Sequence, residues 1–478
     1  MKIEEYYMPQ TTPITKAELT ALLLTVSLAS FATPLISSGV NVALPYISLD
    51  FAIPASHIGW VQTSFLMAYA IFLFPFGKLS DRIGKQKIFM SGLSFQLIGF
   101  FIAGLSTSLP VLLVGMAIGG LGSAQVFSVA IPLLTTNFPR QERGKVIGIN
   151  TAVVYTALAL GPFIGGVLIS AFGWHSVFWI LLPTIALAFA FAIRVIPKLP
   201  KIVPNTTKPF DGLGVVVYII AASLVLTGIS RITEGPDAII MLIIGVAISV
   251  LFLWWEIKQP DPLFPIHIFI ENKLFRNSSL AALINYGSSF AVVLLLSFYL
   301  QSVREFTSIE AGTILIAQPL TMATLTPFTG KLSDRVDPRI LATAGMTMTA
   351  ISLFAFSFLT STTSLWIIIG ILIFLGCGFA LFSSPNMNSI MSSVPDTQAG
   401  IASATAGSMR VFGQVVSMSA VMVAFAAILG SVVISPEVAT PLLKALSTVF
   451  IVLGFLCTVG IWFSYTRGKS DISQENRL

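Results

Sequence analysis

Two copies of one charged hexapeptide are the first residues in this sequence that could do chemistry. GKLSDR stands at Gly77–Arg82 and again at Gly330–Arg335. Each copy offers a carboxylate that can accept backbone N–H groups at a helix N-terminus, and cations that can pair with carboxylates. Such a cluster could hold two helix bundles together in one conformation and release them in another. The plainer alternative is that these charges only orient the chain in a membrane.

Arg410 is the second candidate for chemistry. It lies inside the apolar stretch 399–428, one helical turn before Gln414. An arginine within a membrane must be paired or hydrated. Its partner could be an amide, a carbonyl, water, a loop acid such as Asp396, or a substrate. A structural arginine bonded to carbonyls and a substrate or gating contact both remain open, and a substrate contact would favour an anionic or zwitterionic group.

The other polar side chains inside apolar stretches are mostly neutral. Buried amides in hydrocarbon need partners, and they gather on surfaces that face other helices. Each of them could join two helices or contact a substrate. With Arg410, the candidates for a binding cavity are Asn41, Gln62, Gln125, Tyr155, Asn285, Gln318, Asn386 and Gln414.

The sequence predicts neither an enzyme nor a metal site. Cys377 and Cys457 both lie in apolar stretches and are expected to be small core residues. We find no metal-binding His/Cys cluster, catalytic carboxylate pair or phosphate-binding loop. We therefore expect no catalytic residue, no cofactor and no direct use of ATP.

The elements that must position these residues are membrane helices. Of 478 residues, 55% are hydrophobic and only 10% are charged, whereas roughly a quarter of a soluble protein is charged. Apolar stretches of about twenty residues predict spans, and we expect an all-α integral membrane protein. The fourteen expected spans are 18–45, 57–77, 88–106, 109–135, 146–171, 175–196, 212–232, 236–257, 275–301, 309–330, 340–360, 364–391, 399–428 and 444–465.

The basic residues fix the expected orientation. With the N-terminus in the cytoplasm, 22 of the 26 Lys and Arg residues fall in cytoplasmic segments, as the positive-inside rule requires. This predicts a multi-pass plasma-membrane protein with both termini cytoplasmic and no nucleic-acid partner. The first apolar run is too long for a signal peptide, and we expect none to be cleaved.

The repeated hexapeptide also divides the chain. Each copy is expected to end a span and open a cytoplasmic loop, and Gly59 and Gly312 each lie eighteen residues before their copy. Such a parallel duplication is typical of transporters with two six-helix halves and a substrate site between them. The expected parts are a tail (1–17), a six-helix bundle (18–196), a linker with two extra helices (197–274), a second six-helix bundle (275–465) and a tail (466–478).

These motifs resemble those of the major facilitator superfamily. GKLSDRIGKQK (Gly77–Lys87) is similar to its inner-loop signature, and ALALGPFIGG (Ala157–Gly166) is similar to its antiporter motif. WHSVFWILLP, DGLG, FYLQ and PDTQAGIASATAGSMRVFG are similar to the fourteen-span drug:proton antiporter branch. The resemblance implies a gating role for Gly77, Asp81, Arg82, Gly84, Lys85, Gly330, Asp334 and Arg335.

The antiporter-like stretch has a physical interpretation of its own. Ala157, Gly161 and Gly165 recur every four residues, and small residues at that spacing let two membrane helices touch closely. Pro162 adds a weak point to the helix. Gly166 completes the motif. Tight packing without gating is the alternative to the role in antiport that the resemblance implies.

Two groups that are common in the resembled branch are missing here. LISSGVNVALP (Leu35–Pro45) has Ile36 where the branch commonly has an acidic residue. In MAIGGLG, Met116 and Gly119 stand where it commonly has Arg and Gln. Because proton-coupled transporters usually need a titratable group in the membrane, these departures put proton coupling and cation binding in doubt.

The resulting prediction is a secondary transporter that works by alternating access. We expect a monomer in the lipid bilayer that exports amphiphilic or drug-like small molecules, with protons as the candidate coupling ion. One alternative is an exporter or facilitator of an anionic or lipid-like endogenous solute without the usual proton coupling. The least favoured alternative is a sensor or structural protein that transports nothing.

Overall fold

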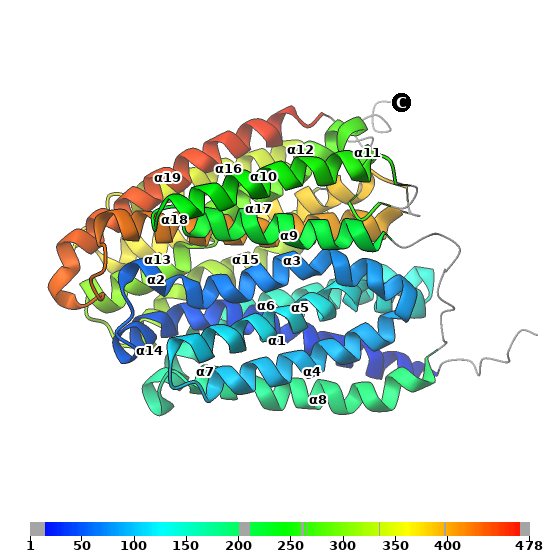
Figure 1. Cartoon of the computed structure of the whole chain (residues 1–478), viewed down its shortest axis with the longest axis horizontal. Helices are drawn as coiled ribbons and strands as arrows, with labels where there is room; N and C mark the ends of the chain where they lie inside the picture. The colour runs from blue at the N-terminus through cyan, green and yellow to red at the C-terminus, as the bar shows by residue number, and fades with distance from the viewer. Residues whose placement is uncertain are drawn as a thin grey trace, which may run out of the picture.

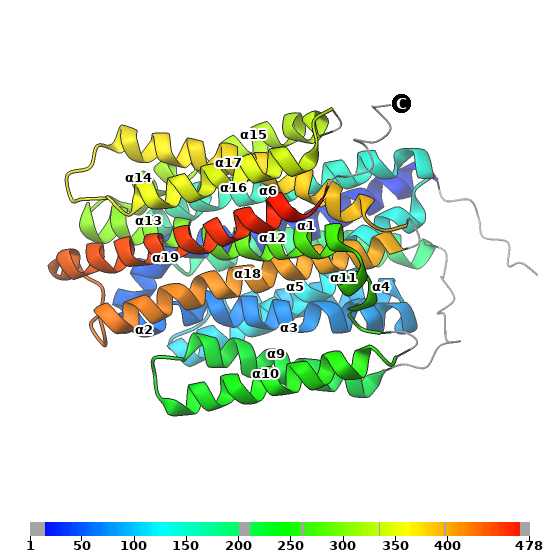
Figure 2. The same cartoon turned by 90° about the horizontal axis from the view of Figure 1, so that it is seen from above.

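The chain folds into a bundle of long helices. The computed structural model describes residues 15–199, 211–259, 262–264, 266–333, 335–395 and 398–468. These residues form helices joined by turns and loops, with one isolated β-bridge, Pro54 to Val433. The helices run side by side along one axis, and both described ends of the chain lie at the same end of the bundle (Figures 1 and 2). We call this end, with Lys16 and Arg467, the terminal side, and the opposite end the far side.

The N-terminal half comprises α1 to α8. α1 begins with a capping box, in which Thr15 and Glu18 satisfy each other's backbone N–H groups. The helices of this half are α1 (Lys16–Asp50), α2 (Ala55–Ile58), α3 (Trp60–Ile83), α4 (Lys85–Gly104), α5 (Leu109–Asn137), α6 (Arg140–Phe172), α7 (Ser176–Trp179) and α8 (Leu181–Val195), followed by the 3-10 turn η1 (Ile196–Lys198).

A linker with three helices precedes the C-terminal half, which starts at α12. The linker contains α9 (Gly212–Ser230), α10 (Pro236–Glu256) and the short α11 (Ile266–Glu271). The C-terminal half contains α12 (Lys273–Ser289), α13 (Val292–Phe298), the π-turn η2 (Tyr299–Val303), α14 (Ser308–Leu315), α15 (Ala317–Leu332), α16 (Pro338–Phe356), α17 (Leu365–Ser392), α18 (Ala399–Ile428), the 3-10 turn η4 (Pro436–Val438) and α19 (Ala439–Thr466).

Thirteen helical segments in the described residues are long and apolar enough to cross a membrane. The one expected span outside these thirteen segments, 309–330, is the tenth along the chain. It is occupied by α14 and α15, which follow each other with a break at Ile316. The break has a local cause: Pro319 has no N–H to donate to the carbonyl of Leu315. A long apolar run in the sequence does not reveal such a break.

A buried arginine fixes the terminal side of the C-terminal half. Arg467, 1% exposed, donates hydrogen bonds to Asn386 Oδ1 (2.7 Å), the Pro338 carbonyl (2.9 Å) and Ser278 Oγ (3.3 Å). These partners lie on α17, α16 and α12. Burial lowers the pKa of Arg467 to about 10, which still leaves the guanidinium charged at neutral pH. One side chain therefore joins α19 to three other helices.

Candidate functional site

The two halves close on each other at the far side. The backbone N–H of Ala55 donates to the carbonyl of Val432 (2.8 Å), beside the bridge between Pro54 and Val433. Gln301 Nε2 donates to the carbonyl of Val42 (3.3 Å). These contacts join α1 and α2 to elements of the C-terminal half, so the space between the halves is sealed at this end.

The antiporter-like stretch of α6 forms another part of the seal. The hydroxyl of Ser308 donates to the carbonyl of Gly166 (3.0 Å). A Cβ on Gly166 would overlap the Ser308 backbone, and a Cβ on Gly312 would overlap the Pro162 carbonyl. Side chains larger than hydrogen at these two positions would therefore force α6 and α14 apart.

The same stretch faces α1 with its other small residues. Gly161 packs against Ser38, and a Cβ on Gly165 would lie 3.1 Å from the Gly39 carbonyl. Ala157 is fully buried. The four-residue spacing thus serves contact within the N-terminal half, whereas Pro162 and Gly166 reach the C-terminal half.

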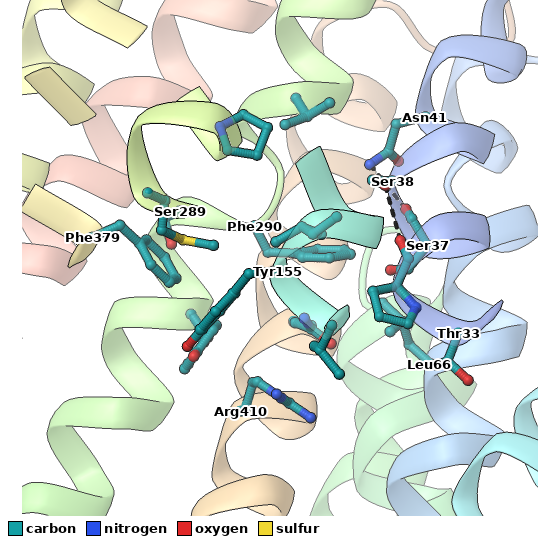
Figure 3. A pocket seen from close by; sticks show the side chains of 18 of the residues that line it. Thr33, Ser37, Ser38, Asn41, Leu66, Tyr155, Ser289, Phe290, Phe379 and Arg410 are labelled. Carbon is teal, nitrogen blue, oxygen red and sulfur yellow. Dashed lines mark hydrogen bonds between the residues drawn. The ribbon is translucent and has the colours of Figure 1, made fainter. Parts of the chain in front are cut away.

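A cavity lies between the halves (Figure 3). About 1000 Å³ between its walls, part of it open to solvent, is not filled by atoms. α1, α3, α5 and α6 line it from one half, and α12, α13, α15, α17 and α18 from the other. Its aromatic wall includes Phe65, Tyr69, Phe127, Tyr286, Phe290 and Phe379. A mostly apolar wall with few polar groups is typical of small-molecule sites.

Arg410 is the one charged side chain among the described residues that line this cavity. Its Nη2 donates a long hydrogen bond to Tyr69 Oη (3.5 Å), and its guanidinium carbon lies 5.9 Å from the ring centre of Phe127. Tyr155 also lies beside it (Figure 3). Since hydroxyls and a ring face do not neutralise a guanidinium, the site favours an anionic or electron-rich group on a bound molecule.

Two amide oxygens in the cavity wall, one from each half, have no hydrogen-bond partner among the described residues. Asn41 donates its amide to the Ser37 carbonyl (3.3 Å), but its Oδ1 is unpaired. Gln318 Oε1 is unpaired as well. Both side chains are more than nine-tenths buried. Because an unpaired buried acceptor is costly, these oxygens are suited to donor groups of a ligand or to water.

The structure brings five of the nine cavity candidates together and leaves four elsewhere. Asn41, Tyr155, Gln318, Arg410 and Gln414 line the cavity. Gln62 donates to the carbonyl of Ser37 (3.2 Å), and Gln125 accepts from Ser91 (2.7 Å), so both join helices within the N-terminal half. Asn386 accepts from Arg467, and Asn285 is fully buried with both amide atoms unpaired among the described residues.

Sequence reasoning missed the aromatic surroundings of Arg410. Tyr69 and Phe127 come from α3 and α5, and Tyr286 comes from α12. Nothing in the spacing of these aromatic residues separates them from residues that face lipid. Tyr155, which was a candidate, also bonds Ser383 across the halves, with 2.9 Å between the hydroxyl oxygens.

The first hexapeptide lies in the last turns of α3, so the expectation that it opens a loop is wrong. α3 continues to Ile83 and ends at Gly84, whose φ of +101° favours glycine. Lys85 follows, with its Nζ 4.0 Å from Asp81 Oδ1, and Arg82 lies one residue after Asp81. In the second copy, Gly330 lies in the last turn of α15, which ends at Leu332. Arg335 lies in the turn that follows, whereas Asp334 lies outside the described residues.

Comparisons with known proteins agree on one family. The family model of the Major Facilitator Superfamily matches residues 26–418 and 280–475. The riboflavin transporter RibZ of Clostridioides difficile is 29% identical over 379 residues, 79% of this chain and 82% of RibZ. The multidrug resistance protein Stp of Mycobacterium tuberculosis (strain CDC 1551 / Oshkosh) is 28% identical over 406 residues, 82% of this chain and 72% of Stp. The crystal structure of the POT family transporter PepTSo has the same fold, with a TM-score of 0.66 at 15% identity over 94% of this chain and 98% of PepTSo.

Proposed function

The chain belongs to the Major Facilitator Superfamily, and on that basis we propose that it exports amphiphilic, drug-like small molecules by alternating access. The observation that carries the proposal is the cavity between the halves. Residues of both halves form its wall, which is mostly aromatic and apolar. Such a wall accepts varied apolar bodies, while a few polar groups orient them. The relative Stp is named a multidrug resistance protein, which supports the same substrate class.

The sealed far side supports the alternating-access part of the proposal. In our interpretation the terminal side faces the cytoplasm, because most of the Lys and Arg residues that the structure describes lie there. The structure then represents a conformation that is closed to the outside. Opening it requires separation of Gly166 from Ser308 and of Ala55 from Val432. We propose that the α3–α4 hexapeptide, with Asp81, Arg82 and Lys85, stabilises one of the two conformations.

Arg410 favours a second candidate substrate class. A cavity with one cation and no carboxylate among its described lining residues suits an anionic endogenous solute better than a cationic drug. The relative RibZ is named a riboflavin transporter, so riboflavin belongs in the substrate screen. For this class we propose transport without the usual proton chemistry.

Flux through the purified protein in liposomes tests both proposals. A thermal-shift screen of cationic, neutral and anionic amphiphiles first identifies ligands that stabilise the protein. Uptake of these ligands is then measured with and without a pH gradient. Gradient-driven flux of amphiphiles supports the antiporter proposal, gradient-independent flux of an anion supports the second, and no flux of any stabilising ligand contradicts both.

A further inference from the structure

A second polar cluster lies at the terminal side, outside the cavity, where α9 begins and α10 ends. Glu256, the last residue of α10, is 0% exposed, and its Oε2 accepts a hydrogen bond from the N–H of Phe264 (3.1 Å). Its other oxygen, Oε1, is buried and has no partner among the described residues. A buried carboxylate oxygen without a donor is costly, and a proton on it removes the negative charge.

Asp211 is the second carboxylate of this cluster. As the N-cap of α9, it accepts hydrogen bonds from the Gly214 N–H (2.8 Å, at Oδ1) and from Trp255 Nε1–H (2.9 Å, at Oδ2). A Cβ on Gly214 would overlap Asp211 Oδ2 and would lie 3.0 Å from Glu256 Oε1. The unpaired oxygen of Glu256 therefore faces the same glycine as Asp211. A second carboxylate this close disfavours ionisation of the buried Glu256.

Lys78 of the first hexapeptide supplies the positive charge. Its Nζ donates to the Pro262 carbonyl (3.4 Å), and Lys78 and Asp211 are the described charged groups whose fields reach Glu256. Lys258, just beyond α10, instead lies over the ring of Trp254, with 3.4 Å from its Nζ to the ring centre. His267 and Glu271 of α11 are exposed.

Residues 262–264 connect this cluster to both halves. Phe264 packs on Phe74 of α3 with 5.8 Å between ring centres, and on Phe269 of α11 with 5.5 Å. Phe269 in turn contacts Phe275 in the first turn of α12, at 6.3 Å. The hydrogen bond from Phe264 to Glu256 thus holds the entry to the C-terminal half beside α3, next to the α9–α10 hairpin (Figure 2).

We propose that Glu256 and Asp211 bind one proton between them, and that this proton controls how firmly residues 262–264 are anchored to α3. With the proton on Glu256 Oε1 the carboxyl group is a weaker acceptor for the Phe264 N–H, and the segment is held less firmly. Loss of the proton to solvent on the terminal side leaves a Glu256 carboxylate that accepts this N–H more strongly and holds the segment, although it then faces the Asp211 carboxylate. A proton fits better than a metal ion because no group of three or more His, Cys, Asp and Glu side chains lies together in the described residues.

Infrared spectroscopy tests the proton site without any transport assay. The carbonyl stretch of protonated carboxyl groups is followed in the full-length protein in lipid as the pH is raised. We expect a band that persists at neutral pH in the wild type and is lost in Glu256→Gln, while Glu271→Gln, an exposed acid on the same side, keeps it. A band unchanged in folded Glu256→Gln would overturn the proposal.

Asp211→Asn provides a second test if Glu256→Gln fails to fold. Asparagine retains the N-cap of α9 but removes the neighbouring charge. The band should then disappear at a lower pH than in the wild type, because deprotonated Glu256 no longer faces a second carboxylate. A band that disappears at the wild-type pH would overturn the sharing of one proton.

The step from protonation to transport rests on the proposed function and has its own readout. Amide hydrogen exchange in 262–275 should rise with pH by less than the intrinsic increase in the wild type, and should follow the full intrinsic increase in Glu256→Gln. The pH dependence of flux should flatten in the same variant. A wild type with the infrared band but no flux would contradict the proposed function and leave the proton site standing. Flux with an unchanged pH profile in Glu256→Gln would overturn the coupling.

Discussion

The Ser308 hydroxyl donates a hydrogen bond to the carbonyl of Gly166 (3.0 Å), and this contact ties α14 to α6 across the two halves. The hydrogen bond and the close backbone approach depend on the absence of a side chain at Gly166. The antiporter-like stretch of α6 therefore contributes to the seal between the halves as well as to the packing of α6 on α1.

Replacing Gly166 with valine should destabilise the conformation in which the far side is closed. Overpacking of this kind costs about 1–3 kcal/mol, which corresponds to a change of about 5- to 150-fold in a two-state population. Distances between spin labels at the far ends of α6 and α14 should lengthen and transport should fall. The matched control is Gly148→Val in the same helix, where an added Cβ meets nothing within 4 Å. Equal distances in the two variants would contradict the role of Gly166 in closure.

Arg410→Met should weaken binding of anionic ligands by about tenfold or more, because a hydrogen bond to a charged group contributes about 1.5–3 kcal/mol. Neutral ligands of the same size should bind nearly as before. Arg410→Lys should retain part of the affinity, since it keeps the charge but loses the planar fork. Titration calorimetry of an anionic and neutral ligand pair measures the difference. An identical loss for both ligands would assign Arg410 a structural role.

Asn41→Ala and Gln318→Ala should each lower the affinity for ligands that carry N–H or O–H groups. The loss of one neutral hydrogen bond is about 0.5–1.5 kcal/mol, or up to about tenfold in the dissociation constant. Gln125→Ala is the control, because this amide bonds Ser91 away from the cavity. If the control changes the ligand profile as much as the cavity variants do, the unpaired oxygens do not contact the ligand.

Asp81→Ala should impair transport while leaving membrane insertion intact, and Asp334→Ala should do less. The second copy of the hexapeptide is followed by Val336–Arg339, without a glycine that matches Gly84. Flux normalised to the amount of inserted protein compares the two variants. Wild-type flux in Asp81→Ala would dismiss a gating role for the hexapeptide.

Arg467→Met should destabilise the C-terminal half. It leaves Asn386 Oδ1 and the Pro338 carbonyl without their donor, and each unsatisfied buried group costs about 1–3 kcal/mol. The melting temperature in detergent should drop clearly, whereas Lys444→Met, at an exposed position of the same helix, should leave it nearly unchanged. Equal melting temperatures would show that the Arg467 bonds are replaced by water.

Much of the fold could be predicted because the bilayer selects for apolar length. The apolar stretches located the helices, and the repeated GKLSDR indicated the duplication before any packing was known. The break at Ile316 could not be predicted from the apolar run, because Pro319 interrupts the helix only through the one N–H group that it lacks. The predicted end of this helix at Gly77 is also wrong. The backbone of Gly77 is helical, and the chain turns at Gly84 instead.

The site was harder to predict, because the sequence does not show which helix faces contact each other and which line the cavity. Asn386 and Gln318 look alike as amides in apolar runs, yet one bonds Arg467 and the other faces the cavity. Glu256 stands at the boundary of a span, where acids are usually solvated. It is buried nevertheless, and it accepts a hydrogen bond from the N–H of Phe264, which lies beyond the end of α10.

The bond from the Ala55 N–H to the Val432 carbonyl has a consequence for how this transporter can vary. Both partners are main-chain atoms, so nearly any residue can stand at either position and the bond survives. An alanine scan of the loops after α1 and α18 would therefore leave it untouched, and only Ala55→Pro would remove its donor. The sequence of these loops can therefore vary while the hydrogen bond that closes the far side is kept.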